Sequence, residues 1–319
     1  IVIGLVIANV FNVGGGYTLT TDELSYEAKA APSFIETIVN IFPSNFVQPM
    51  SDASMLQIIV IALFFGFGIL AAGKKAQPVA DFVNGMSEGC IKIMHMIITI
   101  APFGVFGLIT PVVATNGPDI LLPLLKLILV AYLAMILHMV VVYSGMVKAI
   151  AKMGPLTFFK GQVRAMTFAF ASASSVGTLP INMECSEKLG VRREVSSFVL
   201  PLGATINMDG TAIYQGVCAI FIAQVFGIDL TIGQQCVIVM TAVLSSIGTA
   251  GVPGSGMIML AMVLQSVGLP VEGIALVAGV DRVLDMMRTV VNITGDQSCA
   301  VCVDHLEKRK EARKAAKAA

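Results

Sequence analysis

The chain has 319 residues, of which 56% are hydrophobic and only 13% are charged. Soluble globular domains carry about 25% charged residues, so this composition excludes an ordinary soluble enzyme and an intrinsically disordered protein. The 20 Lys and Arg residues balance the 20 Asp and Glu residues, which leaves no overall positive field to attract nucleic acid. The mean hydropathy of +0.86 is typical of a polytopic membrane protein.

Apolar segments follow one another along the chain, separated by polar connections. Residues 1–11 are apolar but too few to cross a bilayer, which needs about 20 residues, so we interpret them as the end of a spanning helix. The polar stretch over residues 12–52 is typical of an extracellular loop. The segments that are long enough to span cover residues 55–72, 90–113, 120–150, 195–226 and 274–303.

Basic residues recur at alternate connections, which predicts the orientation of the chain. Connections rich in Lys and Arg face the cytoplasm, so we expect a multi-pass protein of the cell membrane with a cytoplasmic C-terminus. The alternation requires segments 158–187 and 231–267 each to enter and leave the membrane on one side, as re-entrant hairpins. The basic residues concerned are Lys74, Lys75, Lys148, Lys152, Lys188, Arg192, Arg193 and those of the tail, residues 308–317.

Both of these segments are interrupted in the middle by small and helix-breaking residues. Residues 174–180 read SSVGTLP, and residues 245–256 read SSIGTAGVPGSG. Gly and Pro are common in membrane helices, so one such break carries little weight. Two matched breaks favour a transporter built from inverted repeats with its site near the bilayer midplane, because each is followed by an Asn- and Asp-bearing interruption, at 207–211 and 292–296.

Charged side chains inside the last segment are candidates for a binding site, because a charge near the bilayer centre is costly. Asp281, Asp285 and Arg288 are spaced by four and three residues and share one helical face, which Asn292 continues. A face that alternates acid, base and amide suits a zwitterion. Alternatively, Arg288 and Asp285 neutralise each other as a structural pair, and the sequence leaves both interpretations open.

The arrangement of the histidines and cysteines does not indicate an enzyme. The histidines at positions 95, 138 and 305 belong to neither an HExxH nor a GxSxG arrangement. The six cysteines lie mostly in apolar runs, and we interpret them as packing residues. We therefore expect a transporter that has no enzymatic activity and needs no cofactor.

With these motifs the chain resembles the dicarboxylate/amino acid:cation symporter family, the glutamate transporters, and within it the archaeal and bacterial sodium:aspartate symporters. The resemblance covers essentially the whole chain and is carried by residues 174–180, 207–211, 246–256 and 281–296. It implies an all-α polytopic membrane protein with the glutamate-transporter fold, which contains inverted repeats, two re-entrant helical hairpins and broken helices. It also implies a homotrimer with an elevator mechanism. By this likeness, we expect the first two helices of the fold and most of the third to precede residue 1.

The same resemblance implies how the chain is divided. Scaffold and trimerisation helices occupy residues 53–112, preceded by the loop and the start of the scaffold at 12–52. Residues 1–11 and 118–308 form the transport domain, and a basic cytoplasmic tail occupies residues 309–319. Within the transport domain we expect hairpin 1 at about 155–188, a broken helix at 194–226, hairpin 2 at about 231–267 and a broken helix at 272–308.

Individual residues also take roles from the resemblance. Asp285 binds the amino group of the substrate, and Arg288 binds its side-chain carboxylate. The α-carboxylate is held by Asn292, Thr289 and Ser175. The full substrate-binding set is Ser174, Ser175, Thr211, Val252, Gly256, Asp285, Arg288, Thr289 and Asn292.

Sodium is the implied coupling ion, held where carboxylate, amide and main-chain oxygens converge, as suits a hard cation. One implied site uses Gly203, Asn207, Asn292 and Asp296, a second uses carbonyls around Thr205, Ser246, Ile247 and Thr249, and a third uses Asn207 and Asp209.

The leading hypothesis is therefore a sodium-coupled importer of L-aspartate or L-glutamate. A proton- or sodium-coupled C4-dicarboxylate carrier is an alternative, although Asp285 would then have no ammonium to meet. A neutral amino acid carrier would leave Arg288 without a partner. A ligand-gated anion conductance is the alternative from a different functional class.

Overall fold

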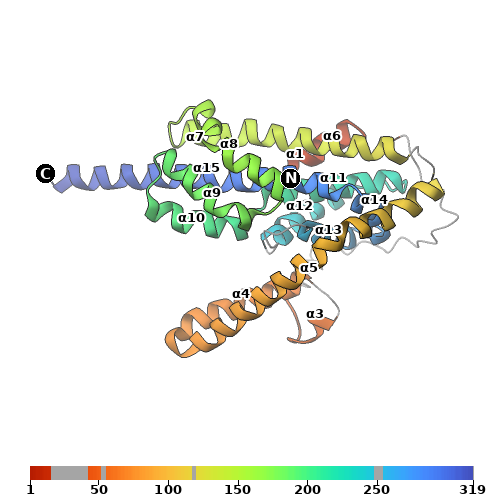
Figure 1. Ribbon diagram of the computed structural model, residues 1–319, viewed down its shortest axis with the longest axis horizontal. Coiled ribbons are helices and arrows are strands. Elements are labelled where there is room, and N and C mark those ends of the chain that lie inside the picture. Colours follow the sequence, from red (N-terminus) through yellow and green to blue (C-terminus); the bar gives the residue numbers. More distant parts are fainter. Residues whose placement is uncertain (16–41, 52–54, 117–119, 248–253, 319) are drawn as a thin grey trace.

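The computed structural model describes residues 1–15, 42–51, 55–116, 120–247 and 254–318, and the regular structure within them is entirely helical. Figure 1 shows that α15 passes through the length of a helical body and extends beyond it. The predicted all-α architecture is confirmed for the described residues. Two segments, Val60–Cys90 and Leu121–Ala149, are long and apolar enough to cross a membrane.

The helices follow the expected spanning segments closely in the middle of the chain. The expected segment 55–72 is α4, and the segment 120–150 is α6 and α7 joined by a π-helical turn, η4. The bounds are α1 Val2–Val10, α3 Gln48–Ser51, α4 Met55–Ala72, η2 Gly73–Ala76, α5 Gln77–Asn116, α6 Leu121–His138, η4 Met139–Tyr143, α7 Ser144–Ala149, α8 Pro155–Ser172, α9 Ser175–Lys188, α10 Arg193–Ile206, α11 Asp209–Val225, α12 Ile232–Ile247, α13 Ser255–Ser266, η5 Val271–Gly273, α14 Ile274–Ala278 and α15 Asp281–Ala318.

The centre of the body is α11, which is buried along nearly its whole length. It packs against α1, α6, α12, α13 and α15, and a single apolar cluster joins these helices. A helix that is apolar on all sides needs neighbours on all sides, and this requirement places α11 inside the bundle. The motif at its N-terminus, residues 207–211, is thereby carried into the interior of the protein.

A second part of the structure, α4 with the adjoining part of α5, projects from this body (Figure 1), and α4 contacts it at α12 and α13. Its apolar residues are exposed, including Phe64 of α4 and Phe82 of α5, each of which is 66% accessible. Apolar surface on this scale marks a lipid or protein contact. The expected scaffold therefore carries the surface that a membrane or another subunit would cover.

Hairpin 1 consists of α8 and α9, which pack side by side in antiparallel directions. The chain reverses at Ala173, whose left-handed conformation (φ 52°) ends α8, and Ser174 caps α9 by accepting a hydrogen bond from the Gly177 amide. Gln162 of α8 donates to Asn182 of α9 across the hairpin at 3.1 Å. Serine is favoured at such a cap because its hydroxyl satisfies an amide that has no partner within the helix.

The second hairpin is described only in its arms, α12 and α13, which also pack together. Its expected tip falls mostly on residues 248–253, which lie outside the described residues. The α13 arm begins after Gly254, which adopts a left-handed conformation (φ 80°) that glycine accommodates without strain.

The helix interruptions differ between the two halves. The chain breaks between α10 and α11 at Asn207 and Met208, within the expected polar stretch 207–211. The stretch 292–296, by contrast, lies inside continuous α15, and the break comes earlier, between α14 and α15. Polar residues lower the hydropathy of a segment without removing its helical hydrogen bonds. Asn292 and Asp296 therefore point at α11 and α10 from an intact helix.

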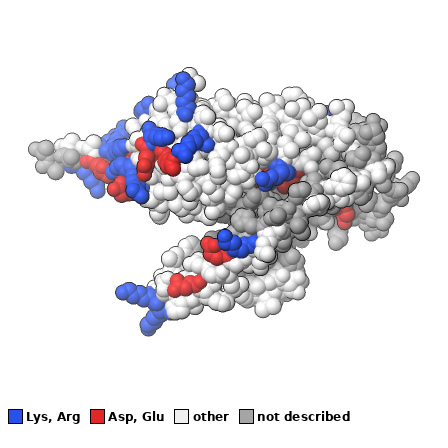
Figure 2. Space-filling model, viewed as in Figure 1, with Lys and Arg blue, Asp and Glu red and all other residues white. Residues whose placement is uncertain are grey.

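Charged residues gather at the end of the body from which α15 emerges, and most of the remaining surface in Figure 2 is uncharged. There Arg192 binds Asp304 at 2.7 Å and Glu311 at 2.9 Å, and Lys308 binds Asp304 at 2.6 Å. Burial by itself would raise the pKa of Asp304, but the hydrogen bonds from Lys308 and Arg192 outweigh it and lower that pKa. These pairs attach α15 to the connection that follows hairpin 1.

Close contact between α11 and α15 depends on Gly210, because a β-carbon there would overlap the main chain of Arg288. Gly210→Ala should lower the free energy of unfolding by roughly 1–3 kcal/mol, as overpacking does. No described atom lies within 4 Å of the position that a β-carbon on Gly145 of α7 would take. Gly145→Ala should therefore be neutral or stabilise by up to ~1 kcal/mol. Thermal unfolding in detergent compares the two, and equal melting temperatures would contradict the close contact.

Candidate functional site

Arg288 of α15 lies at the centre of a buried cluster of charges. Its side chain is 2% exposed, and its Nη2 lies 2.6 Å from Asp285 Oδ1. On the other side, its Nη1 lies 3.8 Å from Asp281 Oδ1. The guanidinium carbon is 4.6 Å from the ring centroid of Tyr214 on α11, which is cation–π distance. One guanidinium thus faces two carboxylates and an aromatic ring.

Hairpin 2 approaches the same cluster through its α13 arm. The Gly254 amide donates to Asp285 Oδ2 at 2.9 Å, so Asp285 joins the hairpin to Arg288. A β-carbon on Gly256 would collide with the Arg288 guanidinium. Glycine at position 256 therefore lets the N-terminus of α13 approach Arg288, and helix N-termini favour anions.

Asn292 connects α15 to the start of α11. Its Oδ1 accepts a hydrogen bond from the Gly210 amide at 2.8 Å, and its Nδ2 lies 3.4 Å from Thr211 Oγ1. Thr289, one turn before Ile293 on the same helix, is buried with them. These predicted substrate residues therefore lie within about two helical turns of the Asp285–Arg288 pair.

The tip of hairpin 1 supplies the remaining described members of the predicted substrate set. Ser174 caps α9, and Ser175 is its first residue and is buried. Arg282 in the first turn of α15 donates to the Ser172 carbonyl at 3.3 Å, which brings the tip beside the turn that precedes Asp285. Val252 and Thr249 lie outside the described residues.

A second group of predicted residues surrounds Asp296, one turn beyond Asn292. Asn207 Nδ2 donates to Asp296 Oδ1 at 3.0 Å and to the Asn292 carbonyl at 3.3 Å. Gly203 packs directly against Asp296, where a β-carbon would collide with the carboxylate. Gly203, Asn207, Asn292 and Asp296 are therefore brought together, as predicted for a sodium site.

Asp209 lines the same cavity as Asp296. Its Oδ2 accepts a hydrogen bond from Tyr143 Oη at 2.8 Å and lies 3.5 Å from His138 Nε2. A cavity of about 310 Å³ is lined by Tyr143, Asn207, Asp209 and Asp296 among other residues. Its two carboxylates and one amide are oxygen ligands that suit a hard cation.

Tyr143 and His138 were not among the predicted site residues. His138 immediately precedes the π-helical turn η4 and Tyr143 is its last residue, and their rings meet edge to face at 4.9 Å. Turns of this kind occur frequently at functional sites because the extra residue redirects side chains. The sequence signal that could have identified them is that both are polar residues inside an otherwise apolar spanning segment.

Thr205, Ser246 and Ile247 lie at the C-terminal ends of α10 and α12, which pack against each other. The last carbonyls of a helix lack intrahelical partners and form the negative end of its dipole. The hydroxyl of Thr205 donates to the Leu202 carbonyl and that of Ser246 to the Val243 carbonyl. The main-chain carbonyls at these helix ends are therefore candidate cation ligands, and the two hydroxyl oxygens keep their acceptor lone pairs.

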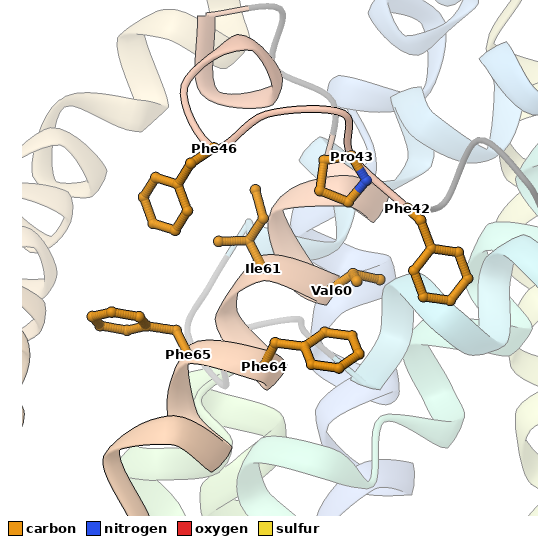
Figure 3. Close-up of a pocket in the computed structure, with 7 residues that line it drawn as sticks. All are labelled: Phe42, Pro43, Phe46, Val60, Ile61, Phe64 and Phe65. Atoms are coloured by element: carbon orange, nitrogen blue, oxygen red, sulfur yellow. The ribbon is translucent and has the colours of Figure 1, made fainter. Parts of the chain in front are cut away.

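Two further observations narrow the choice of ligand and of binding site. Within the described ranges, no three His, Cys, Asp or Glu side chains converge as they would around a transition metal. The pocket of about 450 Å³ in Figure 3 lies between residues 42–46 and α4 and is lined entirely by apolar side chains. That pocket has no group to orient a charged solute, so the charged cluster on α15 remains the candidate site.

Comparison with known proteins shows the family of the chain. The model of the sodium:dicarboxylate symporter family matches residues 1–306. The chain belongs to this family. It is 38% identical to a proton/sodium-glutamate symport protein of Bacillus caldotenax, over 96% of this chain and 75% of the relative. It is 36% identical to a proton/glutamate-aspartate symporter of Escherichia coli (strain K12), over 99% of this chain and 74% of the relative.

A third relative, a C4-dicarboxylate transport protein 1 of Ralstonia nicotianae, is 36% identical over 99% of this chain and 76% of its own length. Membership of a sodium:dicarboxylate symporter family confirms the expected resemblance, a membrane-embedded transporter and the absence of an enzymatic role. The names of the relatives differ in substrate and in coupling ion. Substrate and ion therefore have to be argued from the site.

The hydroxyl of Tyr143 stabilises the half-buried Asp209 carboxylate, so Tyr143→Phe should lower the free energy of unfolding by about 1–3 kcal/mol. Tyr132 is a matched control, because its hydroxyl donates to a neutral acceptor, the Val283 carbonyl, at an exposed position. Tyr132→Phe should cost about 1 kcal/mol or less. Thermal unfolding of both variants measures the difference, and a larger loss in the Tyr132 variant would contradict this role for Tyr143.

Proposed function

We propose that the protein is a sodium-coupled symporter that imports acidic amino acids, aspartate or glutamate. The observation that carries this proposal is the buried pair of Asp285 and Arg288, which presents one negative and one positive group side by side. An acidic amino acid carries an ammonium and a side-chain carboxylate at a similar separation. The pair therefore matches the charges of this substrate class.

The proposed binding step is an exchange of partners. The substrate ammonium takes the place of Arg288 on Asp285, while the substrate side-chain carboxylate takes the place of Asp285 on Arg288. A guanidinium binds a carboxylate through two parallel hydrogen bonds, which adds geometric selectivity. Asp281 and Tyr214 continue to contact the guanidinium during the exchange, so its positive charge keeps a buried partner.

Asn292, Thr289 and Ser175 are the proposed ligands of the α-carboxylate. Ser175 opens α9, and Gly256 lies in the first turn of α13, so two helix N-termini favour the anionic end of the substrate. Thr211 is positioned beside Asn292. This arrangement supports a ligand with two carboxylates and one ammonium.

Sodium coupling is proposed because the cation ligands touch the substrate ligands. Asn207 donates to the Asn292 carbonyl and to Asp296, so Asn292 belongs to both sets. In this proposal hairpin 2 closes over both ligands, which the hydrogen bond from the Gly254 amide to Asp285 supports. Each ligand should therefore raise the affinity of the other, and linkage makes this effect reciprocal.

A C4-dicarboxylate carrier is the second candidate, favoured by the Ralstonia relative. Such a substrate has no ammonium, so Asp285 would meet a carboxylate with a like charge. A neutral amino acid would leave Arg288 with no anionic partner from the substrate. Proton coupling and an anion conductance are further outcomes that transport measurements distinguish.

We further propose an elevator mechanism in a homotrimer. The scaffold, residues 53–112, remains fixed, and residues 1–11 with 118–308 move as the transport domain. The way in which α4 and the adjoining part of α5 project from the helical body supports this division (Figure 1). Hairpins 1 and 2 would then enter the membrane from opposite sides without crossing it.

The deciding experiment is uptake by the full-length protein in proteoliposomes. Labelled aspartate, glutamate and succinate are supplied in parallel under an inward sodium gradient, an inward proton gradient or no gradient. The proposal requires sodium-driven uptake of an amino acid. Preferred uptake of succinate would instead support the C4-dicarboxylate carrier, and uptake driven by protons alone would contradict sodium coupling.

Sodium should also control substrate affinity at equilibrium. Aspartate affinity should rise steeply with sodium and much less with potassium or choline at equal ionic strength, because sodium completes the Asp296 site. Asp296→Asn removes a carboxylate ligand, so its sodium titration midpoint should move to higher concentration and its aspartate affinity at fixed sodium should fall. Calorimetric titrations measure both. An unchanged midpoint in the variant would remove Asp296 from the cation site.

Arg288 should decide the preference for acidic substrates. Arg288→Cys removes the carboxylate contact but keeps Asp285 for an ammonium, so aspartate binding should fall at least a hundredfold while neutral amino acids become possible ligands. Breaking a buried charge pair costs about 3–5 kcal/mol, which is several hundredfold or more in affinity. Aspartate affinity within a few-fold of the unaltered protein would contradict the role of Arg288.

A further inference from the structure

Arg282 joins two parts of the site that lie on different structural elements. It belongs to the first turn of α15, next to Asp281 and three residues before Asp285. Its Nη2 donates to the carbonyl of Ser172, the last residue of α8, at 3.3 Å. Arg282 is therefore in contact with the tip of hairpin 1, while its own helix carries the Asp285–Arg288 pair.

The Ser172 carbonyl is a suitable acceptor for a cation. It lies at the C-terminal end of α8, where carbonyls lack partners within the helix and where the dipole is negative. Hydrogen bonds with one charged partner are stronger than those between neutral groups. Arg282 is exposed, but its guanidinium has a specific acceptor on the hairpin.

Ser172 also sets the conformation of the tip that follows it. Its hydroxyl accepts a hydrogen bond from the Ser174 amide at 3.3 Å. Ala173 between them adopts the left-handed conformation, and the Ser174 hydroxyl then caps α9. A displacement of Ser172 would therefore be transmitted to Ser174 and to Ser175, the proposed α-carboxylate ligand.

Other hydrogen bonds between hairpin 1 and α15 lie far from the tip. Gln162 and Asn182 both donate to the Ile293 carbonyl, at 3.4 and 3.2 Å. Ile293 is about three turns further along α15 than Arg282, roughly 16 Å at 1.5 Å per residue. These bonds fix the middle of the hairpin. The lateral position of the tip therefore depends on contacts that the tip itself makes.

We propose that Arg282 is a positioning residue for substrate binding, which holds the tip of hairpin 1 at a fixed separation from Asp285 and Arg288. This inference rests on the proposed function. It predicts that loss of the Arg282 contact weakens substrate binding through the α-carboxylate, without removing the charge selectivity that Arg288 provides. Asn292 and Asp296 lie about three and about four turns along α15 from Arg282, so sodium binding alone should not depend on it.

The test compares Arg282→Gln, Arg282→Lys and the control Arg164→Gln in the full-length protein. Arg164 is an exposed arginine of the same hairpin, but its partner Glu184 belongs to the other arm of that hairpin and not to α15. Aspartate affinity is measured by calorimetry at saturating sodium, and sodium affinity is measured without aspartate. Thermal unfolding is recorded for each variant.

Arg282→Gln should weaken aspartate binding about tenfold, which corresponds to the loss of one hydrogen bond to a charged group at an exposed position. Sodium affinity and melting temperature should stay close to those of the unaltered protein. Arg282→Lys should recover affinity to within about threefold, because an ammonium can donate to the same carbonyl. Arg164→Gln should bind aspartate normally.

Three results would overturn the inference. Arg282→Gln would bind aspartate as well as the unaltered protein, or Arg282→Lys would be as weak as Arg282→Gln, or Arg282→Gln would lose sodium affinity and thermal stability together with aspartate affinity. Failure of the unaltered protein to bind aspartate at any sodium concentration would instead refute the proposed function, so the two failures are distinguishable.

Discussion

The burial of Arg288 is the constraint on which the site depends. An arginine keeps its charge in a protein, and leaving that charge buried without partners costs several kcal/mol. Asp285, Asp281 and the ring of Tyr214 surround the guanidinium and make its burial tolerable. Gly256 gives it space, since any side chain there would collide with it. A substrate that offers its own carboxylate can replace one of these partners without exposing the charge to apolar surroundings.

The ends of helices provide the other electrostatic interactions of the proposed site. In the proposed arrangement, the N-termini of α9 and α13 carry the substrate residues Ser175 and Gly256, whereas the C-termini of α10 and α12 provide the carbonyls for a cation. Opposite ends of the helix dipole thus meet ligands of opposite charge. Broken helices and hairpins place such ends inside the protein, which an unbroken spanning helix cannot do, because its ends lie at the membrane surfaces.

Several parts of the site could be predicted from local patterns. The spacing of Asp281, Asp285, Arg288 and Asn292 indicated one helical face, and all four contact the same interior region. The residue types at 207–211 predicted a break, and the chain breaks there. The stretch 292–296 also contains Asn and Asp, yet it remains helical, because polar side chains do not remove the main-chain hydrogen bonds of a helix. Asn292 and Asp296 instead bind Gly210 and Asn207 of the neighbouring elements. Tyr143 was missed because its importance comes from Asp209, which is distant in sequence.

The sequence by itself determined the membrane environment, the helical class and the family, because composition, apolar segment length and contiguous motifs are local properties of the chain. It also determined which charges must find partners, since an isolated charge in an apolar segment is costly wherever it lies. The tertiary structure alone decided which partners they find. Tyr214 lies against Arg288, Tyr143 binds Asp209, and Arg282 contacts Ser172. Each of these contacts joins helices far apart along the chain, and their packing depends on side-chain shape across the whole interior, which no local pattern records.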